Sequence, residues 1–127
     1  MSETLLLFTY GLLRPGQTGH RSLDLAAKTR LAGPDRIHGR LYHLGEYPGL
    51  IIGAPGIVLG ELLAFDDPAL VHELDAYELY DSDQPNASEY RRVEVDLLDS
   101  GKRALTYEYN RPVKSRPIIA SGEWPGG

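Results

Sequence analysis

The residue of this chain whose chemistry stands out is Glu78, an acid at a position where the helical pattern requires an apolar side chain. Residues 66–80 are predicted to form one helix. At about 100° per residue, its apolar side chains share a stripe about 120° wide: Leu70, Val71, Leu74 and Tyr77. Glu78 lies inside this stripe, where a carboxylate is costly unless it is paired or neutral, so its pKa should rise. A carboxyl with a raised pKa suits proton transfer near neutral pH.

Two other interpretations of Glu78 stay open on the pattern alone. The helix could end near Tyr77, because helix ends are defined only to within one or two residues, and Glu78 would then face solvent. Glu78 could also form a structural ion pair with Arg91 or Arg92. Only a role in chemistry requires the carboxyl to be both buried and unpaired.

A second candidate feature is Tyr10-Gly11, where the apolar strand predicted over residues 4–9 gives way to a loop. Glycine allows the backbone to approach a ligand closely. The following N–H groups of Leu12 and Leu13 could then line an anion pocket. A Tyr-Gly pair at the end of a strand also occurs in ordinary turns, so this feature gains weight only in combination with another.

Several kinds of chemistry lack the residues they need. The sequence has no GxSxG elbow, no GxGxxG motif and no P-loop, and it contains no cysteine. None of the four histidines is paired at the spacing of a zinc protease site, which makes a metal site improbable: His20, His38, His43 and His72. A net charge of -5 argues against nucleic acid or an anionic membrane as the main partner.

The scaffold expected around these residues is one α+β domain over residues 1–127, as the length of 127 residues suggests. The sheet is predicted to be mostly antiparallel and strongly curved, with two main helices. The elements expected besides strand 4–9 and helix 66–80 are a helix from Thr18 to about Leu31 ended by Gly33-Pro34, strands 37–44, 61–65 and 90–98, a hairpin turn at 99–101, a return strand over 103–109 and an irregular tail from about 111. The polar loop 81–88 is either a lid or an ordinary surface loop.

The chain shows no apolar run long enough to span a membrane and no signal-peptide pattern, so a cytoplasmic location is expected. Hydrophobic residues make up 42% and charged residues 24% of the sequence, as in ordinary globular proteins.

Five segments, taken in order, resemble the γ-glutamylcyclotransferase-like family, which includes the γ-glutamylamine cyclotransferases (AIG2-like proteins). The segments are Tyr10-Gly11-Leu12-Leu13-Arg14-Pro15-Gly16, Tyr47-Pro48-Gly49-Leu50, Leu74-Asp75-Ala76-Tyr77-Glu78, Tyr90-Arg91-Arg92-Val93-Glu94-Val95 and Ile118 to Trp124. The resemblance covers nearly the whole chain. It implies a small mixed, mostly antiparallel β-barrel with a cavity beside the first loop.

The resemblance also implies a reaction of the acyltransferase or lyase type that uses no metal or cofactor. The α-amine of a small γ-glutamyl compound attacks its own γ-carbonyl, which yields 5-oxoproline and a free amine or amino acid. Glu78 would be the general acid/base, and Tyr10, Gly11, Leu12 and Leu13 would bind the substrate. Tyr107, on the inward face of its strand, would add a hydroxyl or a ring wall. The oligomeric state and the leaving group stay undefined.

Two positions depart from the family pattern: Leu12 stands where Thr or Ser is common, and Leu79 replaces the glycine that follows the acid. These departures motivate an alternative, a non-catalytic module that binds a small ligand on the same scaffold. A further alternative is a hydrolase that pairs Glu78 with Glu46 or Glu61, which would require two carboxylates at a defined separation.

Overall fold

A computed structural model describes residues 4–125 of the chain. Its elements are β1 Leu5–Thr9, α1 Thr18–Ser22, α2 Leu25–Lys28, β2 Arg30–His38, β3 Arg40–His43, β4 Pro48–Ile51, β5 Ile57–Phe65, α3 Leu70–Tyr77, the 3₁₀ helix η1 Pro85–Ala87, β6 Tyr90–Asp96, β7 Arg103–Tyr109 and β8 Ile118–Ile119. The predicted domain boundaries, 1 and 127, lie outside the described residues. Among residues 4–125, no helix has the length and apolar composition that crossing a membrane would require.

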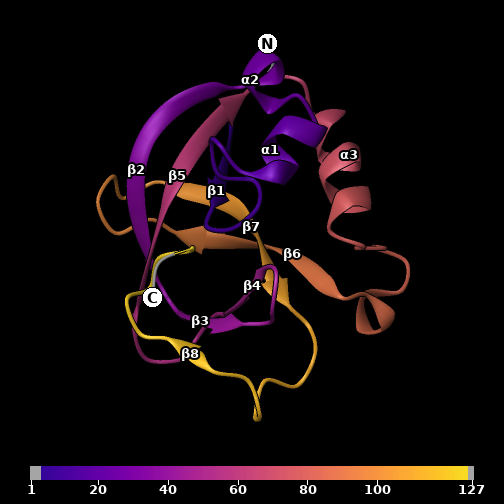
Figure 1. Ribbon diagram of the computed structural model, residues 1–127. Coiled ribbons are helices and arrows are strands. Elements are labelled where there is room, and N and C mark those ends of the chain that lie inside the picture. The colour runs from indigo at the N-terminus through magenta and orange to yellow at the C-terminus, as the bar shows by residue number, and fades with distance from the viewer. Residues whose placement is uncertain (1–3, 126–127) are drawn as a thin grey trace.

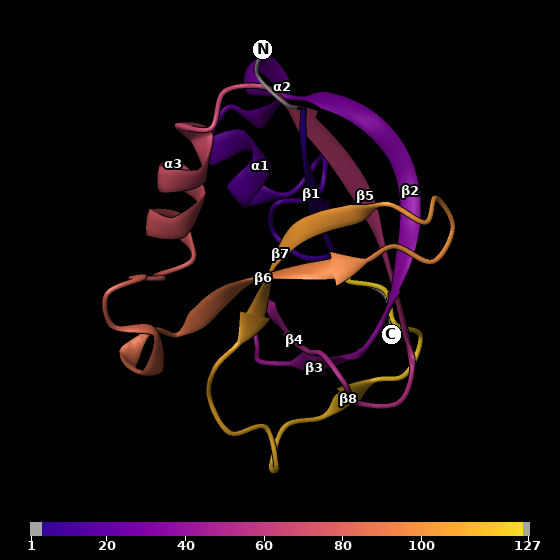
Figure 2. The same ribbon diagram turned by 180° about the vertical axis from the view of Figure 1, so that it is seen from behind.

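Two sheets form the β part of the fold (Figure 1). The larger has the strand order β2-β5-β1-β7-β6, and the smaller has the order β4-β3-β8. The strands pair antiparallel except β1 and β7, which run parallel with Leu7 opposite Leu105. The long strands β2 and β5 bend strongly (Figure 2). Within the described residues β2 and β6 stay at opposite edges, so the larger sheet curls without closing into a barrel. The predicted α+β class with a mostly antiparallel, curved sheet is confirmed in this open form.

The helix predicted from Thr18 to about Leu31 is wrong in its length. The structure has two short helices, α1 and α2, separated at Asp24, whose φ of 52° is left-handed. Leu31 belongs to β2 instead, where it pairs with Leu63 of β5 and is 65% exposed. Its spacing from earlier apolar residues matched a helix, but pairing with a neighbouring strand overrides that local preference. The predicted helix end at Gly33 is a bulge inside β2.

Helix α3 is shorter at its start than the predicted 66–80. Asp67 and Pro68 form the turn that precedes it, and the Asp67 carboxylate accepts the N–H of Ala69 at 2.9 Å. Leu70 and Leu74 are buried, as the apolar stripe predicted. The helix ends at Tyr77, and Glu78 occupies the position directly after its last helical residue. The Glu78 carboxyl therefore lies at a helix end, where its direction depends on how the chain leaves the helix.

Strand β1 divides the core into two parts, because its side chains alternate between two faces. Leu7 packs with apolar side chains of the helices, including Leu25, Leu70 and Leu74. Phe8 packs toward the smaller sheet and the C-terminal segment, whose buried side chains include Leu41, Leu50, Ile119 and Trp124. Figure 1 shows α1, α2 and α3 toward one end of the molecule and the smaller sheet at the other. The end of β1 lies between these parts.

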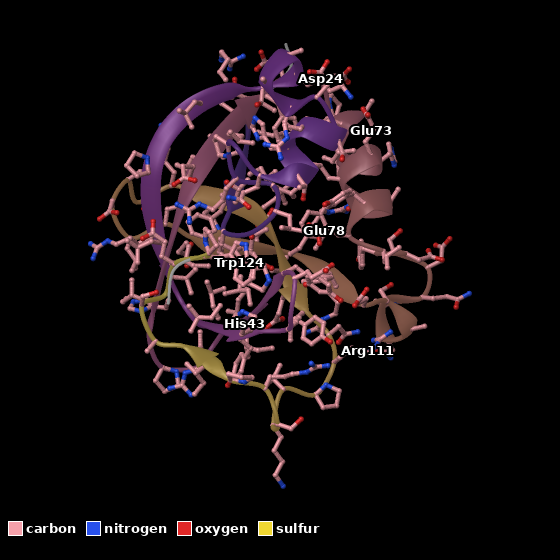
Figure 3. All side chains as sticks on the ribbon, viewed as in Figure 1. Asp24, His43, Glu73, Glu78, Arg111 and Trp124 are labelled. Atoms are coloured by element: carbon pink, nitrogen blue, oxygen red, sulfur yellow. The ribbon has the colours of Figure 1, made fainter. Side chains whose placement is uncertain are left out.

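The C-terminal segment is more ordered than the predicted irregular tail. Ile118–Ile119 forms β8, which pairs antiparallel with β3 through Leu41 and Tyr42. Trp124 is buried, and its ring lies 5.3 Å from that of His43 (Figure 3). The predicted hairpin is confirmed as β6 and β7, whereas the predicted strand 37–44 is two strands, β2 and β3, that meet at Gly39.

Candidate active site

A cavity of about 290 Å³ opens where β1 ends, beside the end of α3 and the start of β6. Its walls consist mostly of apolar and aromatic side chains with a few polar groups, as is usual for small-molecule sites. The lining residues come from the end of β1 and the loop after it, and from β4, α3, β6 and β7. They include all six residues that the sequence singled out: Tyr10, Gly11, Leu12, Leu13, Glu78 and Tyr107.

The Glu78 carboxyl lies in this cavity without a charged partner. Among the described residues it makes no ion pair, since Arg91 pairs with Glu108 at 2.8 Å and Arg92 pairs with Asp75. Burial, with a smaller contribution from the nearby Glu89, raises the pKa of Glu78 to about 8. Figure 3 shows Glu78 toward the middle of the molecule at the end of α3. The helix does end at Tyr77, as one interpretation supposed, but Glu78 lines the cavity, so its predicted solvent-facing position is wrong, and so is the predicted pair with Arg91 or Arg92.

Leu79 adopts the left-handed backbone conformation that a glycine after Glu78 would favour. Its φ of 56° is left-handed, and its N–H donates to the Ala76 carbonyl at 3.3 Å. The N–H of Tyr80 donates to the Asp75 carbonyl at 2.9 Å, which completes a Schellman motif. The Leu79 side chain is 63% exposed, and the residue also lines the cavity. The substitution thus carries a conformational cost of about 1–2 kcal/mol, but the direction of the chain at Glu78 is retained.

The loop after β1 lines the same cavity and carries backbone donors that have no acceptor in the described part of the chain. Among the described residues, no acceptor pairs with the N–H groups of Leu12 and Leu13. Their carbonyls are both held by His20, whose backbone N–H lies 3.0 Å from the Leu12 oxygen and whose Nδ1 donates to the Leu13 oxygen at 3.0 Å. Gly11 packs so closely on Pro48 that an added Cβ would lie 2.8 Å from its Cγ. The loop is therefore fixed with two N–H groups free to bind an anion.

Arg14 anchors this loop from behind. Its guanidinium donates to both oxygens of Glu61, at 2.7 and 2.8 Å, and to Glu123 at 3.1 Å. It also donates to the backbone oxygen of Trp124. Glu61 is thus engaged outside the cavity, and Glu46 is exposed and does not line it. Neither carboxylate is placed to act with Glu78 as the two-carboxylate hydrolase would require.

A chain of hydrogen bonds connects the first loop to α3. The Tyr10 hydroxyl donates to the Tyr107 backbone oxygen at 2.5 Å, and the Tyr107 hydroxyl donates to Asp75 Oδ1 at 2.7 Å. Arg92 binds the same carboxylate, and its guanidinium carbon lies 5.5 Å from the centre of the Tyr80 ring. Asp75 precedes Glu78 by three residues on α3. The Tyr107 ring lines the cavity, while its hydroxyl is already committed to Asp75.

Sequence reasoning missed Glu89 and gave Tyr47 no role at the site. Both line the cavity, and the Tyr47 hydroxyl donates to Glu89 Oε1 at 3.2 Å. The two residues lie 42 positions apart and precede strands of different sheets, so only the packing of the two sheets against each other brings them together. The adjacent loop 81–88 contributes no side chain to the cavity wall. Its end is held in place by Asn110 and Arg111, which both donate to the Ser88 carbonyl.

The described residues contain no group of three or more His, Cys, Asp or Glu side chains that could hold a metal ion. What the cavity offers is one unpaired carboxyl with a pKa near neutrality, two free backbone donors and aromatic walls. This arrangement can move a proton and bind an anionic group at the same time.

Known proteins resemble this chain over most of its length. The sequence model of the family described as gamma-glutamyl cyclotransferase, AIG2-like, matches residues 7–126. The chain is 34% identical to the gamma-glutamylcyclotransferase family protein YtfP of Escherichia coli K12, over 93% of this chain and 94% of that protein. It is 33% identical to gamma-L-glutamyl-butirosin B gamma-glutamyl cyclotransferase of Niallia circulans, over 83% and 67%.

The solution structure of ytfP from Escherichia coli is also similar, with a TM-score of 0.70 and 32% identity. The match covers 95% of this chain and 96% of that one. The family match extends over almost the whole chain and includes every residue that lines the cavity. The chain therefore belongs to the γ-glutamylcyclotransferase family of the AIG2-like type.

Proposed function

We propose that this protein is a cyclotransferase that converts a small γ-glutamyl amine or γ-glutamyl amino acid into 5-oxoproline and the free amine. The observation that carries the proposal is the unpaired carboxyl of Glu78 in the same cavity as the free N–H groups of Leu12 and Leu13. Family membership supports the reaction type, and the geometry supports the roles of the individual residues.

Glu78 acts as the general acid/base of this reaction. The α-amine of the substrate must lose a proton before its nitrogen can attack the γ-carbonyl carbon. A carboxylate with a pKa of about 8 is much closer in basicity to an amine than an ordinary glutamate at 4.5, so it can take that proton at a lower cost in free energy. The new C–N bond closes the five-membered ring and the old amide C–N bond breaks. Glu78 returns its proton to the leaving nitrogen and takes the second proton that the ring nitrogen sheds, which the departing amine then picks up to leave as an ammonium ion.

The N–H groups of Leu12 and Leu13 bind negative charge during this reaction. They can donate hydrogen bonds either to the α-carboxylate of the substrate or to the oxygen that becomes negative as the ring closes. Ring closure is intramolecular, so holding the γ-glutamyl group in a folded conformation supplies much of the rate advantage. Leu12 lacks a side-chain donor, but backbone donors do not depend on the side chain.

The proposal is tested by incubating the purified protein with a panel of γ-glutamyl amines and amino acids and measuring 5-oxoproline. We expect turnover in the wild type and a loss of about 10²–10⁴-fold in kcat for Glu78→Gln. Glu73→Gln is the matched control, because Glu73 lies on the same helix but pairs with Lys28 outside the cavity. If no compound yields 5-oxoproline while some bind, the non-catalytic binding module is the better account.

A further inference from the structure

Glu89 is a second carboxylate in the cavity, and its position is fixed. Its backbone N–H donates to the Leu79 carbonyl at 3.3 Å, and its carbonyl accepts the N–H of Asn110 at 2.8 Å. The Tyr47 hydroxyl donates to Oε1 at 3.2 Å, which leaves Oε2 with no partner among the described residues. Glu89 thus presents one oxygen for which the reaction proposed above has no use.

The charges around Glu89 favour a cation in the cavity. The described lining residues include the carboxylate of Glu89, the acid Glu78, whose raised pKa keeps it protonated near neutral pH, and no Lys, Arg or His. The nearby arginines are engaged elsewhere, because Arg91 pairs with Glu108 and Arg92 pairs with Asp75. A low-dielectric cavity with charge of a single sign attracts a ligand group of the opposite sign and repels one of the same sign.

The rings beside Glu89 add to this preference. Tyr47 and Tyr90 both line the cavity, and the Tyr90 hydroxyl is held by the Pro48 carbonyl at 2.9 Å. Aromatic faces attract ammonium groups and pack well against the methylene chain that carries them. The wall formed by Tyr47, Glu89 and Tyr90 therefore suits an alkyl chain that ends in a cation.

In the proposed function, the γ-glutamyl part of the substrate already has its binding partners in the cavity. Glu78 exchanges the proton of its α-amine, and the N–H groups of Leu12 and Leu13 bind its anionic groups. The part of the substrate without a partner is the leaving amine. We infer that Glu89 selects γ-glutamyl compounds whose leaving amine carries a second, cationic amino group, and that it disfavours leaving amines that carry a carboxylate.

This inference rests on the proposed function, and three probes with the same four-carbon chain test it. They are the γ-glutamyl derivatives of 1,4-diaminobutane, 1-aminobutane and 4-aminobutanoic acid, whose leaving groups end in a cation, a methyl group and an anion. For the wild type, we expect kcat/KM to fall in that order, by about tenfold at each step, which corresponds to about 1.4 kcal/mol.

The decisive variant is Glu89→Gln, which keeps an oxygen for the Tyr47 hydroxyl and removes the charge. It should lower kcat/KM for the diamine derivative by about tenfold and raise it for the acid derivative, with a smaller change for the neutral one. Loss of the Glu89 charge also lowers the pKa of Glu78, but that change affects all three probes alike. The ratios of kcat/KM between the probes therefore report only the contact between Glu89 and the end of the leaving group. Glu46→Gln is the control, because it removes the same charge from an exposed side chain outside the cavity.

Equal kcat/KM values for the three probes in the wild type would overturn the inference and leave the proposed function intact. An equal loss for all three in Glu89→Gln would also overturn it, because Glu89 would then act on the γ-glutamyl part that they share. If no probe yields 5-oxoproline, the proposed function fails, and binding of the three probes measured by calorimetry decides the inference. Tighter binding of the diamine derivative that disappears in Glu89→Gln supports it, and equal binding overturns it.

Discussion

Asp35 and Glu78 are two acids withdrawn from water, and their surroundings shift their pKa values in opposite directions. Asp35 is 2% exposed, and its carboxylate accepts N–H groups from Arg36, Asp99 and Ser100 at 2.7, 2.9 and 3.2 Å. Burial alone would raise its pKa, but these hydrogen bonds outweigh burial and lower it. Asp35 thus stays ionised and holds the β6–β7 turn against β2.

Glu78 receives no such donors, so burial prevails and its pKa rises to about 8. The comparison shows that withdrawal from water does not by itself define a site of chemistry. A carboxylate whose oxygens are all satisfied is part of the scaffold, whereas one left unsatisfied beside a cavity can exchange a proton with a ligand. The predictions that follow test this difference, beginning with the largest effect.

Removing the Asp35 carboxylate should cost the most stability. Asp35→Ala leaves the N–H groups of Asp99 and Ser100 without their acceptor, and hydrogen bonds to a charged group contribute about 1.5–3 kcal/mol each. We expect the free energy of unfolding to fall by about 2–4 kcal/mol, measured by urea denaturation at pH 7. Asp99→Ala is the control, because it removes only an exposed ion pair with Arg36. Equal losses in the two variants would contradict the role given to Asp35.

Replacing Glu78 should raise the free energy of unfolding at high pH, whereas replacing Asp35 lowers it. Because its folded pKa is raised, the folded protein holds a proton that the unfolded chain loses, so stability declines as pH rises from about 4.5 to about 8. Glu78→Gln removes this decline and should be more stable than the wild type at pH 9. We expect a gain on the order of 2 kcal/mol, less than the full shift implies, because the cavity is open to solvent.

The measurement is urea denaturation of wild type and Glu78→Gln at pH 4 and pH 9. The two proteins should have similar stability at pH 4, where both side chains are neutral. Asp35 provides the internal contrast. Because its pKa is lowered, its contribution to stability is lost as the pH falls below the ordinary pKa of an aspartate. A Glu78→Gln variant that is less stable than the wild type at pH 9 would contradict the account.

Asp75 sharpens the comparison because it is a satisfied acid one turn before Glu78 on α3. Tyr107→Phe removes its 2.7 Å hydrogen bond and leaves the Arg92 pair. We expect a loss of about 1 kcal/mol in stability. We also expect kcat to fall about fivefold at unchanged KM, because α3 is then held less firmly against the first loop. The kinetics are measured with a γ-glutamyl amine, and a change in KM alone would indicate that the hydroxyl binds substrate instead.

Leu79 tests whether the position of Glu78 depends on the residue after it. Leu79→Gly relieves the left-handed strain at φ 56° while keeping the Schellman hydrogen bonds, so stability should rise by up to about 1 kcal/mol. Leu79→Ala is the matched control, because it shortens the exposed side chain but keeps the strain. The stabilities of the two variants are compared through the midpoints of their urea denaturation curves. If Leu79→Gly is no more stable than Leu79→Ala, backbone strain at this position is not significant.

The sequence predicted those parts of the site that depend on local pattern. Glu78 was found because it interrupts the apolar stripe of α3, and Gly11 because it ends an apolar strand. The hairpin of β6 and β7 follows from their clean alternation and the turn between them. Each of these features is carried by residues that are close together in the chain.

The features that were missed depend on pairing between distant segments. Glu89 lines the cavity only because β6 begins beside Tyr47, and Asp35 is satisfied only because β2 runs past the β6–β7 turn. The first helix was predicted too long because Leu31 fits a helical spacing, although β5 draws it into a strand. These outcomes are set by tertiary contacts, which periodicity does not contain.

The central claim is that the Glu78 carboxyl is unsatisfied in a cavity of low polarity and therefore holds its proton near neutral pH. The most direct test is an NMR titration of the glutamate side-chain carboxyl carbons in the wild type, with Glu78→Gln used to assign the Glu78 signal. The account predicts a midpoint of about 8 for Glu78. A midpoint near 4.5, the ordinary value for a glutamate, would contradict it.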